Sequence, residues 1–288
     1  MTELDSDDDG EVEGDNADDE RMLFCEKREE TTLLAGSGLG VTRIDVAAAQ
    51  VGQFSLLDRA TVRGLATDGQ TVIVATDDDV SRRTDDGLQS LGFGPAAAVG
   101  IDDSWIYAAD SERVARLDRT GELGYATAED WETVGSADDP RRFAGNLLAA
   151  AELLRVGEEL EPVGVNDVRD LSPDRTLAAA ADGLYENRDG WERVSEGDAT
   201  AVVADGERAH AVVDGRLLER DGEAWTERSL PGGAEPHLLA YGQTLAVIDT
   251  EGTVHVAADP DVTHDGHGGW RSQAIGLRDV TSFLALRE

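Results

Sequence analysis

Two histidines and an aspartate lie within four residues of one another in the stretch HDGHGGW, near the C-terminus. Imidazole and carboxylate groups are common zinc ligands, so His264, Asp265 and His267 could supply three positions of a metal site. No further histidine or cysteine is close in sequence, although the fold could bring His237 and His255 nearby. The alternative, which we prefer, is a solvated loop insertion in a long final repeat. We therefore predict no metal site and leave open whether these three residues bind a metal.

A glycine-rich run, GSGLG (Gly36 to Gly40), has the composition of a phosphate-binding loop. Phosphate binding would need these glycines between a strand and a helix N-terminus, where backbone N–H groups meet the anion. Here the run is followed by VTRIDV, whose alternation of apolar and polar residues is typical of a strand. The pattern therefore predicts a hairpin turn.

Two acidic stretches, DSDDDGE (Asp5 to Glu11) and TDDDV (Thr76 to Val80), suggest calcium binding. An EF-hand loop needs Asp-x-Asp-x-Asp-Gly and a bidentate glutamate at its twelfth position, and neither stretch satisfies this. The chain also lacks a Gly-x-Ser-x-Gly nucleophile elbow. Its single cysteine, Cys25, can form neither an intramolecular disulfide nor a cysteine-based zinc site. We predict no catalytic, cofactor-binding or metal residue from these patterns.

The charge balance is strongly acidic, with 61 Asp and Glu against 25 Lys and Arg, and Lys27 is the only lysine. This composition resembles the proteins of salt-in haloarchaea, where molar salt screens charges to within about 3 Å. We interpret the acidity as solvation of the whole surface. No basic stripe is present, which argues against nucleic-acid binding. No apolar run reaches membrane-spanning length and the N-terminus lacks a signal-peptide pattern, so we expect a cytoplasmic protein that does not bind membranes.

The first residues, MTELDSDDDGEVEGDNADDE, contain eleven acids and no base. Such a segment cannot bury enough apolar surface to offset the entropy lost on ordering. We predict a disordered acidic tail over residues 1–21 and one domain over residues 22–288. Translation could equally begin at Met22, which would remove the tail.

Internal repeats indicate the fold. Seven short apolar runs, each followed by a turn and an outgoing strand, start 30–41 residues apart. They begin at Thr32, Thr71, Trp105, Asn146, Thr176, Ala209 and Thr244. Asp-Gly and Glu-Gly pairs at Asp182, Asp214 and Glu251 fit two-residue hairpin turns. The stretch Ala144 to Leu160 is rich in helix formers, but it aligns with the other repeats, so we predict strands there.

A further strand follows most hairpins, and four of the five tryptophans begin it, at Trp131, Trp191, Trp225 and Trp270. We expect these tryptophans to pack between neighbouring sheets. The next strand leads into the following repeat and is dominated by small residues, as expected for innermost strands around an axis. The final segment, RDVTSFLALRE from Arg278, is one more copy with no hairpin of its own. We predict an all-β, seven-bladed β-propeller whose ring is closed by this C-terminal strand.

The repeat rhythm over roughly residues 30–288 resembles the WD40-like propeller class, and more closely a haloarchaeal β-propeller family with no assigned activity. The Gly-His and Trp-Asp signature of WD40 repeats is absent, and DWETV at Asp130 reverses the second pair. We expect a monomeric, non-enzymatic scaffold that presents one face to a protein partner. The alternative is a propeller enzyme or small-ligand sensor, hydrolase- or lactonase-like, with a site assembled at the mouth of the central channel.

The composition predicts that folding depends on salt. Residues 1–20 hold eleven acids, which leaves 50 acids against 25 bases in the rest. In low salt the Debye length is about 30 Å, so these charges repel one another across the domain. We expect the β-sheet circular dichroism signal to be lost below about 0.1 M salt and regained in molar KCl. A protein that stays folded and monodisperse in salt-free buffer would contradict the haloarchaeal interpretation.

Overall fold

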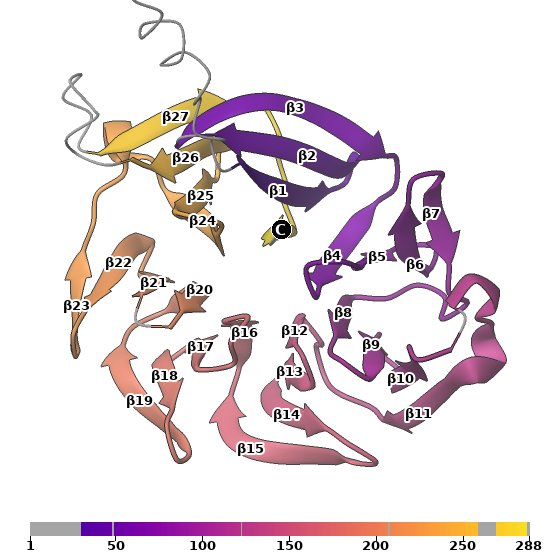
Figure 1. The fold of residues 1–288 in the computed structure, drawn as a ribbon. Coiled ribbons are helices and arrows are strands. Elements are labelled where there is room, and N and C mark those ends of the chain that lie inside the picture. The colour runs from indigo at the N-terminus through magenta and orange to yellow at the C-terminus, as the bar shows by residue number, and fades with distance from the viewer. Residues whose placement is uncertain (1–29, 48, 122, 207, 259–268, 287–288) are drawn as a thin grey trace, which may run out of the picture.

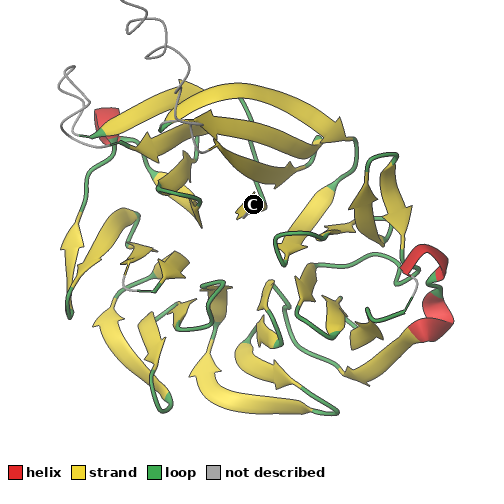
Figure 2. Ribbon diagram, viewed as in Figure 1, coloured by secondary structure: helices red, strands yellow, loops and turns green. Residues whose placement is uncertain are grey.

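The computed structural model describes residues 30–286, apart from 48, 122, 207 and 259–268. Seven antiparallel sheets of four strands each are arranged around a central axis (Figure 1). Almost all regular structure in the described residues is β-strand (Figure 2). The predicted seven-bladed β-propeller is therefore confirmed. The predicted tail, residues 1–21, and Cys25 lie outside the described residues.

Within each blade the strands follow one another in chain order from the channel outwards, except that β28 precedes β1 in the first. Blade 1 contains β28 (Ser282–Leu286), β1 (Glu30–Ser37), β2 (Gly40–Ala47) and β3 (Gln50–Asp58). Blade 2 contains β4 (Val62–Thr67), β5 (Val72–Thr76), β6 (Val80–Thr84) and β7 (Gly87–Ser90). Blade 3 contains β8 (Ala98–Ile101), β9 (Trp105–Ala109), β10 (Val114–Asp118) and β11 (Trp131–Gly135). Blade 4 contains β12 (Arg142–Ala144), β13 (Leu147–Ala149), β14 (Glu152–Val156) and β15 (Leu160–Asn166).

The remaining blades have the same arrangement. Blade 5 contains β16 (Val168–Leu171), β17 (Leu177–Ala180), β18 (Gly183–Asn187) and β19 (Trp191–Glu196). Blade 6 contains β20 (Ala199–Asp205), β21 (Arg208–Val213), β22 (Arg216–Asp221) and β23 (Ala224–Glu227). Blade 7 contains β24 (Pro236–Tyr241), β25 (Leu245–Asp249), β26 (Thr253–Ala257) and β27 (Trp270–Ala274). Short 3-10 helices occur at η2 (Leu123–Tyr125), η3 (Ala128–Asp130) and η4 (Pro231–Gly233).

The hairpin turns agree with the sequence prediction in one case and differ by a residue in another. Asp214 and Gly215 join β21 to β22 with φ angles of 50° and 72°, the left-handed pair that a two-residue turn requires. In blade 5, Gly183 pairs with Ala180 instead, so the turn consists of Ala181 and Asp182. The predicted Asp-Gly turn is therefore shifted by one residue there.

The stretch that combines helix-forming residues with the repeat pattern, Ala144 to Leu160, forms strands as predicted. Leu148 and Leu153 are fully buried, on β13 and in β14. Leu153 and its neighbour Leu154 contribute to different inter-blade clusters, because successive side chains of a strand point to opposite faces of the sheet, and Leu148, which pairs with Leu154, shares its cluster. Burial on both faces overrides the helix propensity of alanine and leucine.

The ring is closed by the C-terminal strand, as predicted. β28 pairs antiparallel with β1, with Leu33 opposite Ala285 and Ala35 opposite Phe283. Phe283 is 1% exposed and belongs to the cluster between blades 7 and 1. The same segment binds the other neighbour, since the hydroxyl of Thr281, the residue before β28, donates to the Val62 carbonyl of blade 2. The first and last described segments thus share one sheet (Figure 1).

The core consists of seven apolar clusters, most of them formed between adjacent blades. Each of the four outer-strand tryptophans packs against such a cluster, as predicted. Trp131 meets Phe93 edge to face at 5.0 Å, and its indole N–H donates to the Leu91 carbonyl of blade 2. Trp270 is 2% exposed in the cluster between blades 6 and 7. A tryptophan at the outer strand is wide enough to fill the gap where the blades diverge.

Neighbouring blades are also joined by hydrogen bonds at their innermost strands. Position x denotes the residues Gly64, Ala98, Arg142, Asp170, Ala201, Leu238 and Ser282, which occupy equivalent places in β4, β8, β12, β16, β20, β24 and β28. In four of these strands the pairing with the next strand shifts in register directly before position x.

That shift turns side chains toward the next blade. The Ser282 hydroxyl accepts a hydrogen bond from the Leu65 N–H, and the Asp170 carboxylate accepts one from the Val202 N–H. One residue earlier, the Arg141 guanidinium donates to the Val168 carbonyl, and the His237 ring bonds the Val280 carbonyl. Each of these contacts satisfies a backbone group on the edge of the neighbouring strand.

No helix among the described residues is long and apolar enough to cross a membrane.

Deletion of residues 279–288 should open the ring, because β1 loses its ladder partner and Phe283 leaves the core. We expect loss of the cooperative melting transition in molar salt. The single change Phe283→Ala should cost about 3–5 kcal/mol of unfolding free energy. Leu39→Ala, at an exposed turn position, is the control and should be nearly neutral. A truncated chain that melts like the full chain would contradict closure by β28.

Candidate ligand site in the central channel

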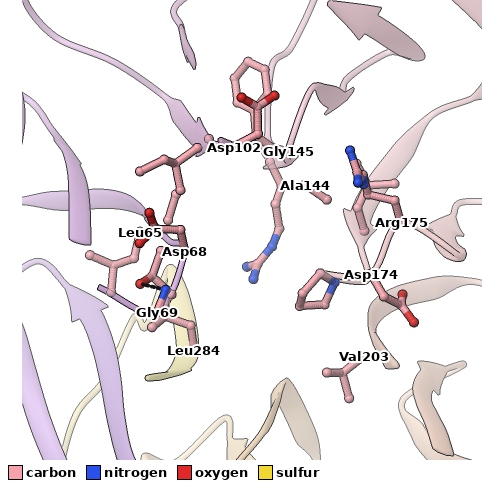
Figure 3. A pocket seen from close by; sticks show the side chains of 18 of the residues that line it. Leu65, Asp68, Gly69, Asp102, Ala144, Gly145, Asp174, Arg175, Val203 and Leu284 are labelled. Atoms are coloured by element: carbon pink, nitrogen blue, oxygen red, sulfur yellow. Dashed lines mark hydrogen bonds between the residues drawn. The ribbon is translucent and has the colours of Figure 1, made fainter. Parts of the chain in front are cut away.

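A cavity of about 610 Å³ lies at one end of the central channel. Its lining comes from all seven innermost strands and from the turns that follow four of them. Small and apolar residues form most of the wall, among them Ala66, Ile101, Ala144, Val203 and Ala240. Charged side chains are concentrated at its mouth (Figure 3).

One residue of the wall, Arg142, forms an ion pair with Asp170, which stands at position x of the adjacent blade behind the cavity lining. Arg142 of β12 places its Nε 2.8 Å from Oδ1 of Asp170 on β16. Asp170 is nearly inaccessible to solvent, with 8% of its side chain exposed. No hydrogen bond forms at Oδ1, so this contact is a close ion pair whose N–H is poorly aimed. The other oxygen accepts the Val202 N–H at 2.9 Å.

Burial determines the protonation behaviour of Asp170. Desolvation raises the pKa of its carboxyl group above the usual range. The Arg142 guanidinium and the amides of Val202 and Leu171 lower the pKa and offset only part of this effect. The positive charge of Arg142 thus stabilises the buried Asp170 carboxylate. Because its guanidinium is held in this ion pair, Arg142 is less free to bind a ligand.

Three of the four aspartates that line the cavity, all except Asp103, are engaged in turns. Asp68 accepts hydrogen bonds from the amides of the residues two and three positions later and pairs with Arg119. Asp102 accepts from the Ser104 and Trp105 amides. These are Asx-type turns, in which the carboxylate stabilises the chain reversal after an innermost strand. The hydrogen bonds and Arg119 lower the pKa of Asp68 against the opposing effect of burial.

Tyr107 buttresses this side of the mouth from within the blade. Its hydroxyl donates to Oδ2 of Asp102 at 2.7 Å, and its ring stacks on Phe143 with centroids 5.8 Å apart. Desolvation raises the pKa of Tyr107, and the bond to Asp102 raises it further. The phenol therefore stays protonated and remains a hydrogen-bond donor to Asp102.

Arg175 differs from the other charged groups of the mouth. It lies in the turn after β16, opposite Asp68 and Asp102 (Figure 3). Its backbone has a φ of 63°, a left-handed conformation that is uncommon for residues other than glycine. Its side chain is exposed, and no described carboxylate lies within ion-pair distance. Asp174 beside it is occupied by the hydroxyls of Ser172 and Thr176.

The Arg175 side chain packs closely over Gly145, and its positive charge lies at the mouth of the cavity. A Cβ on Gly145 would lie 3.1 Å from an Arg175 guanidinium nitrogen and 3.4 Å from its Cδ. Gly145 therefore provides the space that the arginine crosses. The guanidinium is also close enough to Tyr107 to lower the pKa of that phenol slightly against the dominant effects.

The residues weighed for chemistry from the sequence lie elsewhere. His264, Asp265 and His267 are outside the described residues. His237 contacts the Val280 carbonyl, and His255 lies at the outer rim of blade 7, so the two do not converge on one site. Gly36 to Gly40 form the β1–β2 hairpin, as predicted, with Ser37 paired to Gly40.

The acidic stretch Thr76 to Val80 is likewise a turn, between β5 and β6. Asp77 pairs with Arg63, and Asp79 accepts hydrogen bonds from the Gly92 and Gly94 amides. The carboxylates of Asp77 and Asp79 therefore already have protein partners. The described residues contain no group of three or more potential metal ligands.

Sequence reasoning missed Arg142, Asp170 and Arg175. Two of them stand at position x, where most other blades carry Gly, Ala, Leu or Ser. Alignment of the innermost strands would have shown two charged residues at a position of mostly small or apolar side chains, in consecutive blades. Arg175 carries a weaker signal, because the turn SPDRT looks like many surface turns.

The chain matches a known propeller family over almost its whole length. A family model described as HVO_0234-like, beta propeller matches residues 17–286. The chain belongs to this family. No curated protein matches the chain by sequence.

Several solved structures share the fold at low sequence identity. PorZ, an essential surface component of the type-IX secretion system of Porphyromonas gingivalis, superposes with a TM-score of 0.53 at 13% identity, over 81% of this chain and 35% of its own. The extracellular domain of the putative hybrid two-component system BT4673 from B. thetaiotaomicron gives 0.53 at 12% identity, over 77% and 35%. Apo AztD from Citrobacter koseri gives 0.50 at 10% identity, over 88% of each chain.

This family member spans about a third of the length of the PorZ and BT4673 chains. Identities this low show the fold alone.

Arg142→Met should be strongly destabilising, because it leaves Asp170 buried without its counter-charge. We expect a loss of about 3–5 kcal/mol at neutral pH, measured by denaturant unfolding in molar salt. The folded state raises the pKa of Asp170, so the folded variant binds a proton more readily than the unfolded one. The loss relative to wild type should therefore shrink as the pH falls through that raised pKa.

The matched control is Arg63→Met, whose exposed pair with Asp77 should contribute less than about 1 kcal/mol. Equal losses in the two variants, or a loss that grows on acidification, would show that the Arg142–Asp170 pair does not stabilise the channel wall.

Proposed function

We propose that this propeller is a binding protein whose central channel accepts a small anionic ligand, such as a carboxylate or phosphate compound. The observation that carries the proposal is Arg175. It is a guanidinium at the mouth of the cavity, with no carboxylate partner among the described residues, in a chain where acids exceed bases by 36. Most other arginines of the described chain contact a carboxylate or a carbonyl.

The surroundings of Arg175 support this choice of ligand. The mouth also carries Asp68, Asp102, Asp103 and Asp174, but none of these carboxylates forms an ion pair with the guanidinium, and all except Asp103 are held by hydrogen bonds in turns. A left-handed backbone conformation, as at Arg175, costs free energy for a residue other than glycine. Such conformations are retained at binding sites, where the surrounding structure holds them in place. The cavity volume of about 610 Å³ lies within the range of small-molecule sites.

A scaffold for a protein partner stays a prediction. Such a role would be favoured by an apolar patch gathered on one face of the ring. The large apolar side chains that are exposed in the described residues belong to different blades: Leu39, Phe54 and Leu56 to blade 1, Tyr125 to blade 3 and Val194 to blade 5.

Calorimetric titration with citrate and with pyrophosphate, in molar KCl, tests the proposal. We expect one of these polyanions to bind, and Arg175→Gln to lower its affinity at least about tenfold, because a hydrogen bond to a charged group contributes about 1.5–3 kcal/mol. Arg59→Gln, at an exposed arginine away from the channel, should leave the affinity unchanged. Absence of binding by both anions, or equal affinity in wild type and Arg175→Gln, would contradict an anion site at the channel mouth.

A further inference from the structure

Three polar residues at the outer rim of blade 7 form a hydrogen-bonded chain that the channel does not use. The Ser272 hydroxyl on β27 lies 2.7 Å from Nδ1 of His255 on β26. Nε2 of the same ring lies 3.0 Å from Oδ2 of Asp249 at the end of β25. The serine is exposed, whereas the side chains of His255 and Asp249 are 4% and 5% exposed. The order from surface to interior is therefore hydroxyl, imidazole and carboxylate.

The hydrogen-bond partners determine which atom of each pair carries the proton. Oδ1 of Asp249 accepts the amides of Glu251 and Thr253, so this carboxylate acts as an acceptor throughout. Burial acts to raise the pKa of Asp249, but the Thr253 amide and His255 outweigh it, and the pKa lies below the usual range. An ionised Asp249 places the ring proton on Nε2, which leaves the lone pair of Nδ1 facing the serine. The Ser272 hydroxyl then donates to His255.

Strand register holds this geometry. His255 is directly opposite Ser272 in the β26–β27 pair. Two backbone hydrogen bonds establish which facing residues of β26 and β27 are hydrogen-bonded pairs. They run from Ala258 N–H to the Gly269 carbonyl and from Ile275 N–H to the Gly252 carbonyl. They make His255 and Ser272 a non-hydrogen-bonded pair, in which facing side chains are closest. Rigid strands are better supports for such a constellation than loops.

Because His255 and Ser272 are a non-hydrogen-bonded pair, the backbone N–H of Ser272 points away from β26. β27 is the outer edge of its sheet, so no strand occupies that side. A cavity of about 350 Å³ lies against this edge, lined by Ser272 with Gln50, Val51, Pro231, Trp270, Arg271 and Gln273. β27 and β3 lie side by side there (Figure 1). A small reagent can thus reach the hydroxyl and an unpaired N–H that could bind an oxyanion.

We propose that Ser272 is the nucleophile of a hydrolytic site for small carboxylic esters, with His255 as its general base and Asp249 as the residue that positions the imidazole. The relation of a nucleophile, a base and an orienting carboxylate follows the serine-hydrolase arrangement, with the two ring nitrogens exchanged. The site is separate from the channel and from Arg175. If the hydrolytic site fails its test, the proposed anion site at the channel mouth is therefore unaffected.

The chemistry needs only water as a co-reactant. The Ser272 oxygen attacks the ester carbonyl carbon while its proton passes to Nδ1 of His255. The bond to the alkoxy group then breaks, and that proton returns to the leaving oxygen, which gives an alcohol and an acyl-serine. Water attacks the acyl carbon with His255 again taking the proton, and the acid is released as the proton returns to the serine.

A fluorophosphonate with a short alkyl chain tests whether Ser272 is activated, because its phosphorus bonds only to a nucleophilic serine oxygen and fluoride leaves. The full chain is labelled in molar KCl, digested, and analysed by mass spectrometry peptide by peptide. Ser195 on β19, the outer strand of blade 5, serves as the internal control, since its hydroxyl contacts only a backbone carbonyl. We expect Ser272 to label at least about 100-fold faster than Ser195, the range of general base catalysis.

Variants separate activation from a structural role. Ser272→Ala should abolish the labelled peptide, and His255→Asn should reduce its labelling to the Ser195 rate while thermal melting shows a folded chain. Asp249→Asn keeps an acceptor for the turn amides and should slow Ser272 labelling without changing that of Ser195. Turnover of p-nitrophenyl acetate should follow the same order. Equal labelling of Ser272 and Ser195 in the folded wild type, or undiminished labelling in His255→Asn, would overturn the proposal.

Discussion

The innermost strand of each blade has one edge without a strand partner, and the structure depends on how that edge is satisfied. A backbone N–H or carbonyl that is buried without a partner costs about as much as a lost hydrogen bond. Seven such edges converge on the channel. In blades 1, 4, 5 and 7, a side chain at position x or one residue earlier reaches across to the next blade and bonds its edge, as Ser282 does to Leu65 and Asp170 to Val202. These bonds link packing between blades to closure of the ring.

The same constraint shapes the candidate site. A serine can satisfy the neighbouring amide without a charge, but Asp170 brings a carboxylate behind the wall and requires Arg142 beside it. The turns that follow the innermost strands are held by aspartates whose oxygens are already bonded, as at Asp68 and Asp102. What remains available for a ligand is the group that these structural demands do not use, the guanidinium of Arg175.

The sequence predicted the architecture because propeller repeats leave strong local signals. Apolar runs, Gly-containing turns and outer-strand tryptophans recur at a steady spacing, and the unpaired copy at Arg278 indicated how the ring closes. The sites were not predictable in the same way. The chain Ser272, His255 and Asp249 depends on the register of three strands, and a shift of one residue would turn Ser272 to the other face. Local spacing drew attention to His264 and His267 instead, which lie outside the described residues.

Amide hydrogen exchange at Leu65 and Val202, measured in molar salt, tests the central claim that side chains satisfy the innermost edges. Both amides face away from their own sheets, so without Ser282 and Asp170 they would be open to channel water. We expect them to be protected in the wild type as strongly as amides inside the β5 ladder. Ser282→Ala should release the Leu65 amide and leave Val202 protected. Rapid exchange of both amides in the folded wild type, or protection of Leu65 that survives Ser282→Ala, would contradict the account.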